Sequence, residues 1–253
     1  TFTGGTQTAI IGSAALAVVT AGDASKTYGT TYTLGTTAFT ATGLQGSDNI
    51  SGVTLTSAGA INTANAGTYA IVPSDAVFSV GSPGNYTISY VNGTLTVNPA
   101  PLTAAVTGTP TRVYNGTTVA TLAPANYALT GFVSGEGATV TQTAGTYNSK
   151  DVVTATTVSV TLAPTDFTAT GATLLSNYTL PTAASGAGQI TAYAVSMTGV
   201  RAYDSTTSVA AGIFTLNPLV GTETLTLSGT GSVSSANAGT YTVALGTLSL
   251  GTL

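Results

Sequence analysis

The residues that could do chemistry in this sequence are few, and they recur in a fixed order. Among the 253 residues there is no His and no Cys, so a general base or nucleophile would have to come from acids, lysines or hydroxyl groups. Three of the eight acids occupy equivalent places in a repeated pattern, which is simpler to explain by architecture than by catalysis. We therefore predict no enzyme and no catalytic, cofactor-binding or metal-binding residue. The three repeated acids are Asp48, Glu136 and Glu223.

Each of these acids follows a basic residue and a tyrosine. The basic residue stands two positions before the Tyr, and the acid follows about twenty residues after it. One interpretation is an ion pair inside each repeat, worth about 0–1 kcal/mol if exposed; the other is two independent solvated charges. A Lys–Asn isopeptide cross-link is not expected, because two of the three basic residues are Arg. The three sets are Lys26–Tyr28–Asp48, Arg112–Tyr114–Glu136 and Arg201–Tyr203–Glu223.

A second tyrosine recurs in the motif Ala-Gly-Thr-Tyr, at Tyr69, Tyr147 and Tyr241. The repeated tyrosines could line a glycan-binding surface. A Tyr that occurs once per β-repeat more often fills the edge of the core with its hydroxyl bonded to the backbone. We therefore favour the structural interpretation for both sets of tyrosines.

The composition excludes several classes of partner. Charged residues make up 5% of the chain and the net charge is −4, while roughly a fifth of the residues are Thr. The four basic residues are scattered, so no basic stripe could follow a nucleic acid backbone. The acids are isolated and form no Asp-x-Asp-x-Asp calcium loop. A surface with so little charge lacks the repulsion that keeps proteins apart, so we expect self-association.

The longest apolar run, residues 9–19, is interrupted by Gly12 and Ser13 and is too short to span a bilayer. It also lacks the charged start and cleavage site of a signal peptide, so any export signal would lie outside this sequence. We expect no membrane-spanning segment.

Four short signatures recur in the same order and show an internal duplication. Tyr28, Tyr114 and Tyr203 of the first signature are 86 and 89 residues apart. The acid-containing turn and then Ala-Gly-Thr-Tyr follow in each copy, and Asn-Tyr-Thr closes the first two copies at Asn85 and Asn177. Four ordered signatures at a shared period indicate tandem repeats.

Between the signatures, apolar and polar residues alternate with period two. Leu102, Ala104 and Val106 would share one face of a strand, and Gly, Asn and Pro interrupt such runs. About six to eight short strands per repeat favour a small antiparallel β-sandwich of immunoglobulin-like build, with a β-grasp-like sheet as the alternative. The predicted fold class is all-β, with tandem modules arranged end to end.

Two junctions divide the chain into modules. Pro99-Ala100-Pro101 marks the first and the segment near Ala192 the second, which gives modules at 12–100, 101–192 and 193–253. The third module stops before its own Asn-Tyr, and residues 1–11 are similar to the strand that follows this signature. Two interpretations remain open. The sequence is a window of a longer array, or the first strand of each subunit completes the last module of a neighbour by strand addition.

At these signatures the sequence resembles two repeat families of large bacterial exoproteins. Residues 26–29 (Lys-Thr-Tyr-Gly) and 90–97 (Tyr-Val-Asn-Gly-Thr-Leu-Thr-Val) resemble the MBG repeat of YGX type. Residues 114–118 and 203–207 resemble the YDG repeat, with Asn for Asp in the first and Ser for Gly in the second. The resemblance implies an MBG-like module followed by two YDG-like modules. Such repeats occur in filamentous-haemagglutinin-like and other adhesin-type surface proteins, and the families supply no catalytic residues.

Together these features predict a structural repeat segment of a secreted bacterial surface protein or filament, which acts as a stalk or fibre-forming unit. The alternative is an adhesin module that binds a glycan or matrix ligand directly. A binding module should carry a unique insertion or aromatic patch, and the only irregular region is 150–175.

Overall fold

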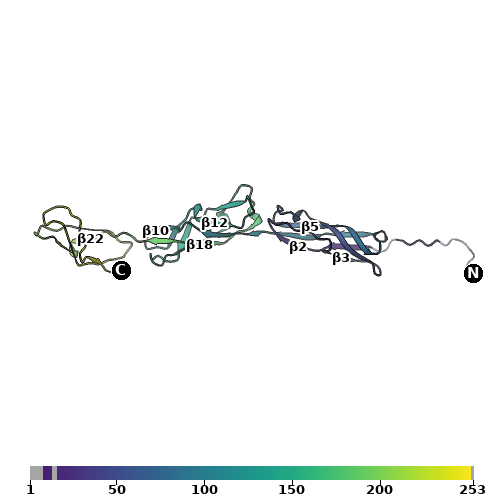
Figure 1. Ribbon diagram of the computed structural model, residues 1–253, viewed down its shortest axis with the longest axis horizontal. Coiled ribbons are helices and arrows are strands. Elements are labelled where there is room, and N and C mark those ends of the chain that lie inside the picture. The colour runs from purple at the N-terminus through teal and green to yellow at the C-terminus, as the bar shows by residue number, and fades with distance from the viewer. Residues whose placement is uncertain (1–7, 13–15, 252–253) are drawn as a thin grey trace, which may run out of the picture. The chain divides into compact units, whose positions relative to one another are not determined.

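The computed structural model describes residues 8–12 and 16–251 and consists of strands and short turns (Figure 1). Within these residues every helical segment is a three-residue 3-10 turn, so the all-β prediction is confirmed. A β-grasp fold packs an α-helix on its sheet, and the described residues provide none. No helix in this part of the chain is long and apolar enough to cross a membrane.

The described chain divides into two compact units, and the border runs through the second repeat. Unit 1 contains the residues up to Ala104 together with Leu129–Thr141 and Leu162–Thr182. Unit 2 contains Ala105–Ala128, Gln142–Thr161 and the residues from Ala183 onward. The module boundaries at 100 and 192 remain predictions.

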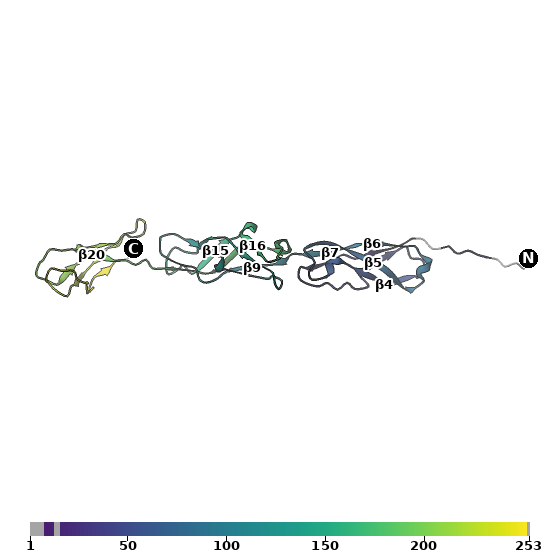
Figure 2. The same cartoon turned by 90° about the horizontal axis from the view of Figure 1, so that it is seen from above.

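The first repeat forms two sheets of unit 1, ordered β3-β1-β6 and β2-β7-β5-β4 (Figures 1 and 2). Alternation decides which side chains are buried: in β1 the residues Ala17, Val19 and Ala21 are buried, and their neighbours are not. Val19 and Ala21 of the first sheet pack with Ile71 and Leu95 of the second in one core, as in a sandwich. The elements are β1 Ala17–Ala21, β2 Ala24–Thr27, β3 Phe39–Thr42, β4 Asn49–Thr56, η1 Ala58–Ala60, β5 Gly67–Val80, η2 Pro83–Asn85, β6 Ile88–Val91 and β7 Gly93–Asn98.

The expectation of antiparallel sheets needs a correction, because the sheets are mixed. β1 is antiparallel to β3 but parallel to β6, and β2 is parallel to β7. Parallel neighbours require a connection of about a dozen residues or more. The many residues between β1 and β6 and between β2 and β7 supply it, so alternating sequence patterns alone could not give the strand direction.

Part of the second repeat also belongs to unit 1. β13 pairs antiparallel with β16, and β17 pairs parallel with β8. A second apolar cluster joins Tyr28 and Val97 of the first repeat to Leu102 and Tyr178 of the second. The elements are β8 Ala100–Pro101, β13 Gly137–Val140, η4 Pro164–Asp166, β16 Phe167–Thr170, η5 Leu175–Asn177 and β17 Tyr178–Thr179.

Unit 2 contains a four-stranded sheet, β11-β14-β15-β18, and the parallel pair β10 and β19. Its core includes Tyr147, Val158 and Ile190, all buried. The elements are β10 Thr111–Val113, β11 Val119–Thr121, η3 Pro124–Asn126, β14 Ala144–Tyr147, β15 Thr157–Thr161, β18 Ala183–Ala187 and β19 Gln189–Thr191. The remaining strands of the second repeat, β9 Thr103–Val106 and β12 Tyr127–Thr130, pair with each other.

The named strands of the third repeat, also in unit 2, pair in two-stranded ladders, and an isolated antiparallel bridge joins Ser232 to Ala244. β20 pairs with β22, β21 with β24 and β23 with β25, all antiparallel. Each strand therefore keeps an edge that no named strand covers. The elements are β20 Met197–Gly199, β21 Ser208–Ala210, η6 Ala211–Ile213, β22 Phe214–Leu216, β23 Leu227–Ser228, β24 Thr230–Ser232 and β25 Ser249–Leu250.

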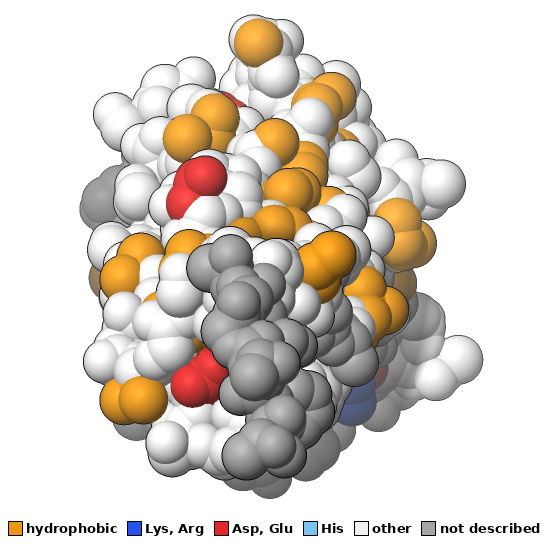
Figure 3. Space-filling view, turned by 90° about the vertical axis from the view of Figure 1, so that its right-hand side faces the viewer, with side chains coloured by type: hydrophobic (Ala, Val, Ile, Leu, Met, Phe, Trp, Pro, Cys, Tyr) orange, Lys and Arg blue, Asp and Glu red, His pale blue; other side chains and the backbone are white. Residues whose placement is uncertain are grey.

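The strand expected at residues 1–11 lies partly outside the described residues, which begin at Thr8. Residues 8–12 form no strand within this chain, and the side chains of Ile10 and Ile11 are 92% and 95% exposed. On the face drawn in Figure 3, hydrophobic and uncharged polar side chains predominate and few charged ones are visible. This agrees with the 5% of charged residues.

Candidate functional site: the tyrosine–carboxylate contacts

Each repeated acid lies at the end of a tight turn. The amide of Glu136 donates to the carbonyl of Val133 at 3.0 Å, and the amide of Glu223 donates to the carbonyl of Val220 at 3.2 Å. Gly135 has a φ of 87°, the left-handed region that glycine adopts at little cost. The turn therefore fixes where the carboxylate projects. Asp48 has the same turn bond, to Gln45.

The tyrosine of the first signature follows a parallel strand pair in the first two repeats. Tyr28 comes directly after β2, and its amide donates to the carbonyl of Asn98 at 2.8 Å. Tyr114 comes directly after β10, and its amide donates to the carbonyl of Thr191 at 2.8 Å. The strand partner in each case leads into the next repeat, so this Tyr is held where one repeat passes into the following one.

The acid of a repeat binds the tyrosine of the repeat before it. The hydroxyl of Tyr28 donates to Oε1 of Glu136 at 2.6 Å within unit 1. The hydroxyl of Tyr114 donates to Oε1 of Glu223 within unit 2. The same contact thus occurs at both junctions between repeats.

The acid also binds a tyrosine of its own repeat, from the Asn-Tyr-Thr signature. Tyr178 donates to the other oxygen, Oε2, of Glu136 and accepts from the amide of Val133 at 3.0 Å. Tyr86 donates to Oδ2 of Asp48 at 2.6 Å and accepts from the amide of Gln45 at 3.0 Å. Glu136 therefore joins two phenol groups from different repeats.

The rings around Glu136 pack closely. The Tyr178 ring meets Tyr28 edge to face at a centroid distance of 5.4 Å and Phe132 at 4.9 Å. Burial, followed by donation to Glu136, raises the pKa of Tyr178 to about 12. Donation to Glu136 and then burial raise the pKa of Tyr28. Each phenol is thus held neutral beside an acceptor.

The Asn of the same signature also crosses the first junction. Asn177 is 2% exposed, and its Oδ1 accepts from the amide of Ala66 at 2.8 Å. Its Nδ2 donates to Oδ1 of Asn65 at 3.0 Å. Asn177, Tyr178 and Tyr86 were not among the predicted motif residues, although Asn-Tyr-Thr recurs in the sequence. That recurrence was the available signal.

Family comparison gives two matches on either side of this junction. Residues 17–96 match the MBG domain (YGX type), and residues 98–186 match the YDG domain. Residues 17–186 belong to these two families. No curated protein and no solved structure matches the chain significantly. Both family matches end before residue 193, so the YDG-like character of the third repeat remains a prediction.

Within the described residues, no ion pair joins Lys26 to Asp48 or Arg201 to Glu223. In the MBG domain, Lys26 donates to the carbonyls of Thr30, at 2.7 Å, and Ile61, and not to Asp48. The Lys26 side chain is buried, with the residue 7% exposed, and this burial lowers its pKa. The basic residue of this repeat therefore ties two loops together through carbonyl groups. The tight turn that carries Asp48 directs the carboxylate to Tyr86 instead.

In the YDG domain, the basic residue closes the loop that carries the tyrosine. Arg112 donates to Oγ1 of Thr117 at 3.0 Å and to its carbonyl, and the guanidinium lies 5.4 Å from the centre of the Tyr147 ring. Asn115, inside this loop, accepts from the amide of Thr117 at 3.1 Å. These bonds engage both terminal nitrogens of Arg112, while its buried Nε has no hydrogen-bond partner among the described residues.

The third repeat reproduces this loop. Arg201 donates to Thr206 and forms an ion pair with Asp204, which also accepts from the amide of Thr206 at 2.9 Å. The hydrogen bond from Arg201 is the main cause that lowers the pKa of Asp204 to about 2. Tyr203 in this loop is 69% exposed, unlike the buried Tyr28.

The second set of tyrosines has mixed surroundings. Tyr147 is buried and donates to the carbonyl of Pro110 at 3.0 Å. Tyr69 donates to the carbonyl of Asn65 at 2.9 Å. Tyr241 is partly exposed. Two of the three therefore anchor backbone of their own repeat.

Proposed function

We propose that this chain is a structural repeat segment of an extracellular bacterial surface protein or filament, and that it acts as a stalk or fibre-forming unit. MBG and YDG domains are typical of extracellular surface proteins, which supports the location. The observation that carries the role is the contact of Glu136 with Tyr28 of the preceding repeat, which recurs between Glu223 and Tyr114.

Such contacts suit a part that must hold repeats together. A hydrogen bond to a charged group contributes about 1.5–3 kcal/mol, and the cluster around Tyr178 adds apolar burial. The proposal includes no enzymatic role, because the repeated acids that could serve as bases are bound to phenol groups. The repeated acids and tyrosines instead hold neighbouring repeats together.

Assembly by strand addition is part of this proposal. The named strands of the third repeat pair two by two, and an edge that neither a strand nor the Ser232–Ala244 bridge covers can pair with another segment. A strand from outside the folded chain would extend these ladders and lengthen the fibre.

Two measurements test the role. Fractionation and surface protease treatment of the producing cells should find the protein outside the cell. When single chains are pulled, the first two repeats should unfold at a measurable force. Glu136→Ala should lower this unfolding force, whereas Asp75→Asn, at an exposed acid, should leave it unchanged. Retention inside the cell, or equal forces in both variants, would contradict the proposal. Selective binding on a glycan array would favour the adhesin alternative.

A further inference from the structure

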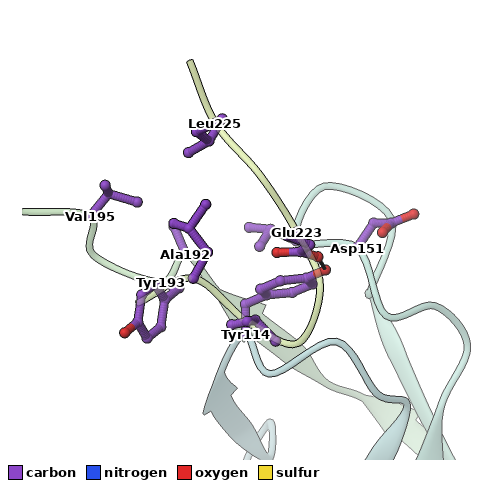
Figure 4. Close-up of a pocket in the computed structure, with 10 residues that line it drawn as sticks. Tyr114, Asp151, Ala192, Tyr193, Val195, Glu223 and Leu225 are labelled. Carbon is purple, nitrogen blue, oxygen red and sulfur yellow. Dashed lines mark hydrogen bonds between the residues drawn. The ribbon is translucent and has the colours of Figure 1, made fainter. Parts of the chain in front are cut away.

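A cavity of about 270 Å³ opens beside Glu223 in unit 2 (Figure 4). Tyr114 and Glu223 lie together on one side, joined by their hydrogen bond, and Tyr193 and Val195 lie on another. Leu219 and Val220 complete the wall on the side of the acid-containing turn. The lining is mainly apolar and carries two carboxylates, those of Glu223 and Asp151.

This cavity corresponds to an occupied place at the first junction. The amides of Tyr28 and Tyr114 donate to Asn98 and Thr191, which makes these two carbonyl residues equivalent. Leu102 and Val195 each lie four residues after these positions, so Val195 is the counterpart of Leu102. The turn bond runs from Glu136 to Val133 in the second repeat and from Glu223 to Val220 in the third. These residues are therefore equivalent, and one position earlier Leu219 is the counterpart of Phe132.

At the first junction, Tyr178 fills the space between these residues. It belongs to one apolar cluster with Tyr28, Leu102, Phe132 and Val133, and it is 5% exposed. Its strand, β17, pairs with β8, and the amide of Leu102 donates to the carbonyl of Thr179 at 3.1 Å. At the second junction the counterparts of these residues line the cavity instead.

The chemistry left at the second junction matches a tyrosine. Oε1 of Glu223 accepts from Tyr114, as Oε1 of Glu136 accepts from Tyr28. Oε2 of Glu136 accepts from Tyr178 at the first junction, and Oε2 of Glu223 is the matching acceptor at the second. A cavity of about 150 Å³ is enough for a benzene ring, so this one has room for a phenol group and part of its backbone. Tyr193 and Ala194, the counterparts of β8, lie in no strand.

We propose that this cavity is a receptor for an extended Asn-Tyr-Thr segment, which takes the place that residues 177–179 take at the first junction. The incoming Tyr donates to Glu223 and packs on Tyr114 and Leu219, while its backbone pairs with residues 193–195. The two Asn-Tyr-Thr segments of this chain already occupy other sites, where Tyr86 and Tyr178 are buried. The inference deepens the proposed fibre role and rests on it for the source of the segment.

The test uses the full 253-residue chain and a capped synthetic peptide with the sequence of residues 174–181, Leu-Leu-Ser-Asn-Tyr-Thr-Leu-Pro. Calorimetric titration should show one site per chain. Replacing the peptide Tyr with Phe should weaken binding about tenfold, as expected for one lost hydrogen bond to a carboxylate, and replacing it with Ala should abolish binding. A peptide of residues 1–11 serves as the competing candidate.

Variants of the chain locate the site. Glu223→Gln should weaken the peptide about tenfold, and Val195→Phe, which fills the cavity, should block it. Asp75→Asn, at an exposed acid in unit 1, should leave binding unchanged. Circular dichroism checks that each variant is folded.

Several outcomes would overturn the inference: no binding to the folded chain, equal binding of the Tyr and Ala peptides, or binding that Val195→Phe leaves intact. Binding of only the 1–11 peptide, or dimers of the chain alone that Val195→Phe dissolves, would make residues of a second copy the occupant and refute an Asn-Tyr-Thr segment. Each result is independent of where the protein is located and of its unfolding force, so failure here leaves the proposed function to its own tests.

Discussion

The hydroxyl of Tyr28 donates a hydrogen bond of 2.6 Å to Glu136, which lies 108 residues later in the chain. The tyrosine directly follows a strand of the MBG domain, and the acid ends a turn of the YDG domain. The second oxygen of Glu136 accepts from Tyr178, so one carboxylate serves two phenols. The predictions below follow from this arrangement and from the loops that position it.

Removal of the Glu136 carboxylate should destabilise unit 1. Glu136→Ala leaves the hydroxyls of Tyr28 and Tyr178 without their acceptor, which should cost about 3 kcal/mol in the free energy of unfolding. Tyr28→Phe removes one of the two bonds and should cost about half as much. Urea unfolding measures both, with Asp75→Asn as the control. A loss below about 0.5 kcal/mol for Glu136→Ala would refute the role of the contact.

Stability should fall in alkaline solution. The pKa of Tyr178 is about 12 in the folded chain, against 10.0 for an ordinary phenol, so the unfolded chain loses this proton first. The contribution of Tyr178 is therefore complete below pH 10 and is lost between pH 10 and about pH 12. Urea midpoints across this range should fall more steeply for the natural chain than for Tyr178→Phe. Lys26 titrates in both proteins, so its effect cancels when their urea midpoints are compared. Midpoints that fall in parallel with pH would contradict the prediction.

Gly29 should not tolerate a side chain. Its φ is +83°, and an added Cβ would lie 2.5 Å from Cγ2 of Val133 in the turn that carries Glu136. Gly29→Ala should therefore cost about 2–4 kcal/mol, from the left-handed backbone and the overlap together. Gly135→Ala separates the two causes, because its φ is +87° but no atom lies within 4 Å of the added Cβ; it should cost about 1–2 kcal/mol. The cost of Gly29→Ala should shrink by about 1 kcal/mol in a Val133→Ala background, and an unchanged cost would show that the overlap is relieved elsewhere.

Lys26 should contribute to stability without Asp48. Lys26→Met leaves the carbonyls of Thr30 and Ile61 without their donor and should cost about 1–3 kcal/mol. Lys150→Met, at an exposed lysine paired with Asp151, should leave the free energy of unfolding nearly unchanged. In a double-mutant cycle, Lys26→Met and Asp48→Asn should be additive within about 0.5 kcal/mol, whereas Tyr86→Phe and Asp48→Asn should be coupled. Coupling between Lys26 and Asp48 would restore the ion pair as the explanation.

The amino-acid sequence by itself determined the repeats and the strands. Period-two alternation identifies buried positions such as Leu102 and Val106, because side chains of a strand point to opposite faces whatever the strand pairs with. The order of the signatures likewise located the repeated tyrosines and acids that form the tyrosine–carboxylate contacts. These are local properties, and they do not depend on how distant segments meet.

Tertiary structure alone decided the partner of each acid. A basic residue and an acid about twenty positions apart suggested an ion pair, yet the terminal nitrogens of Arg112 bond to Thr117 inside its own loop. Glu136 instead meets Tyr28 and Tyr178, which are 108 and 42 residues away. The parallel direction of β2 and β7 was equally hidden, since alternation is the same in both directions. A carboxylate binds whichever donor the fold brings within about 3 Å, and that proximity is set by the path of the whole chain.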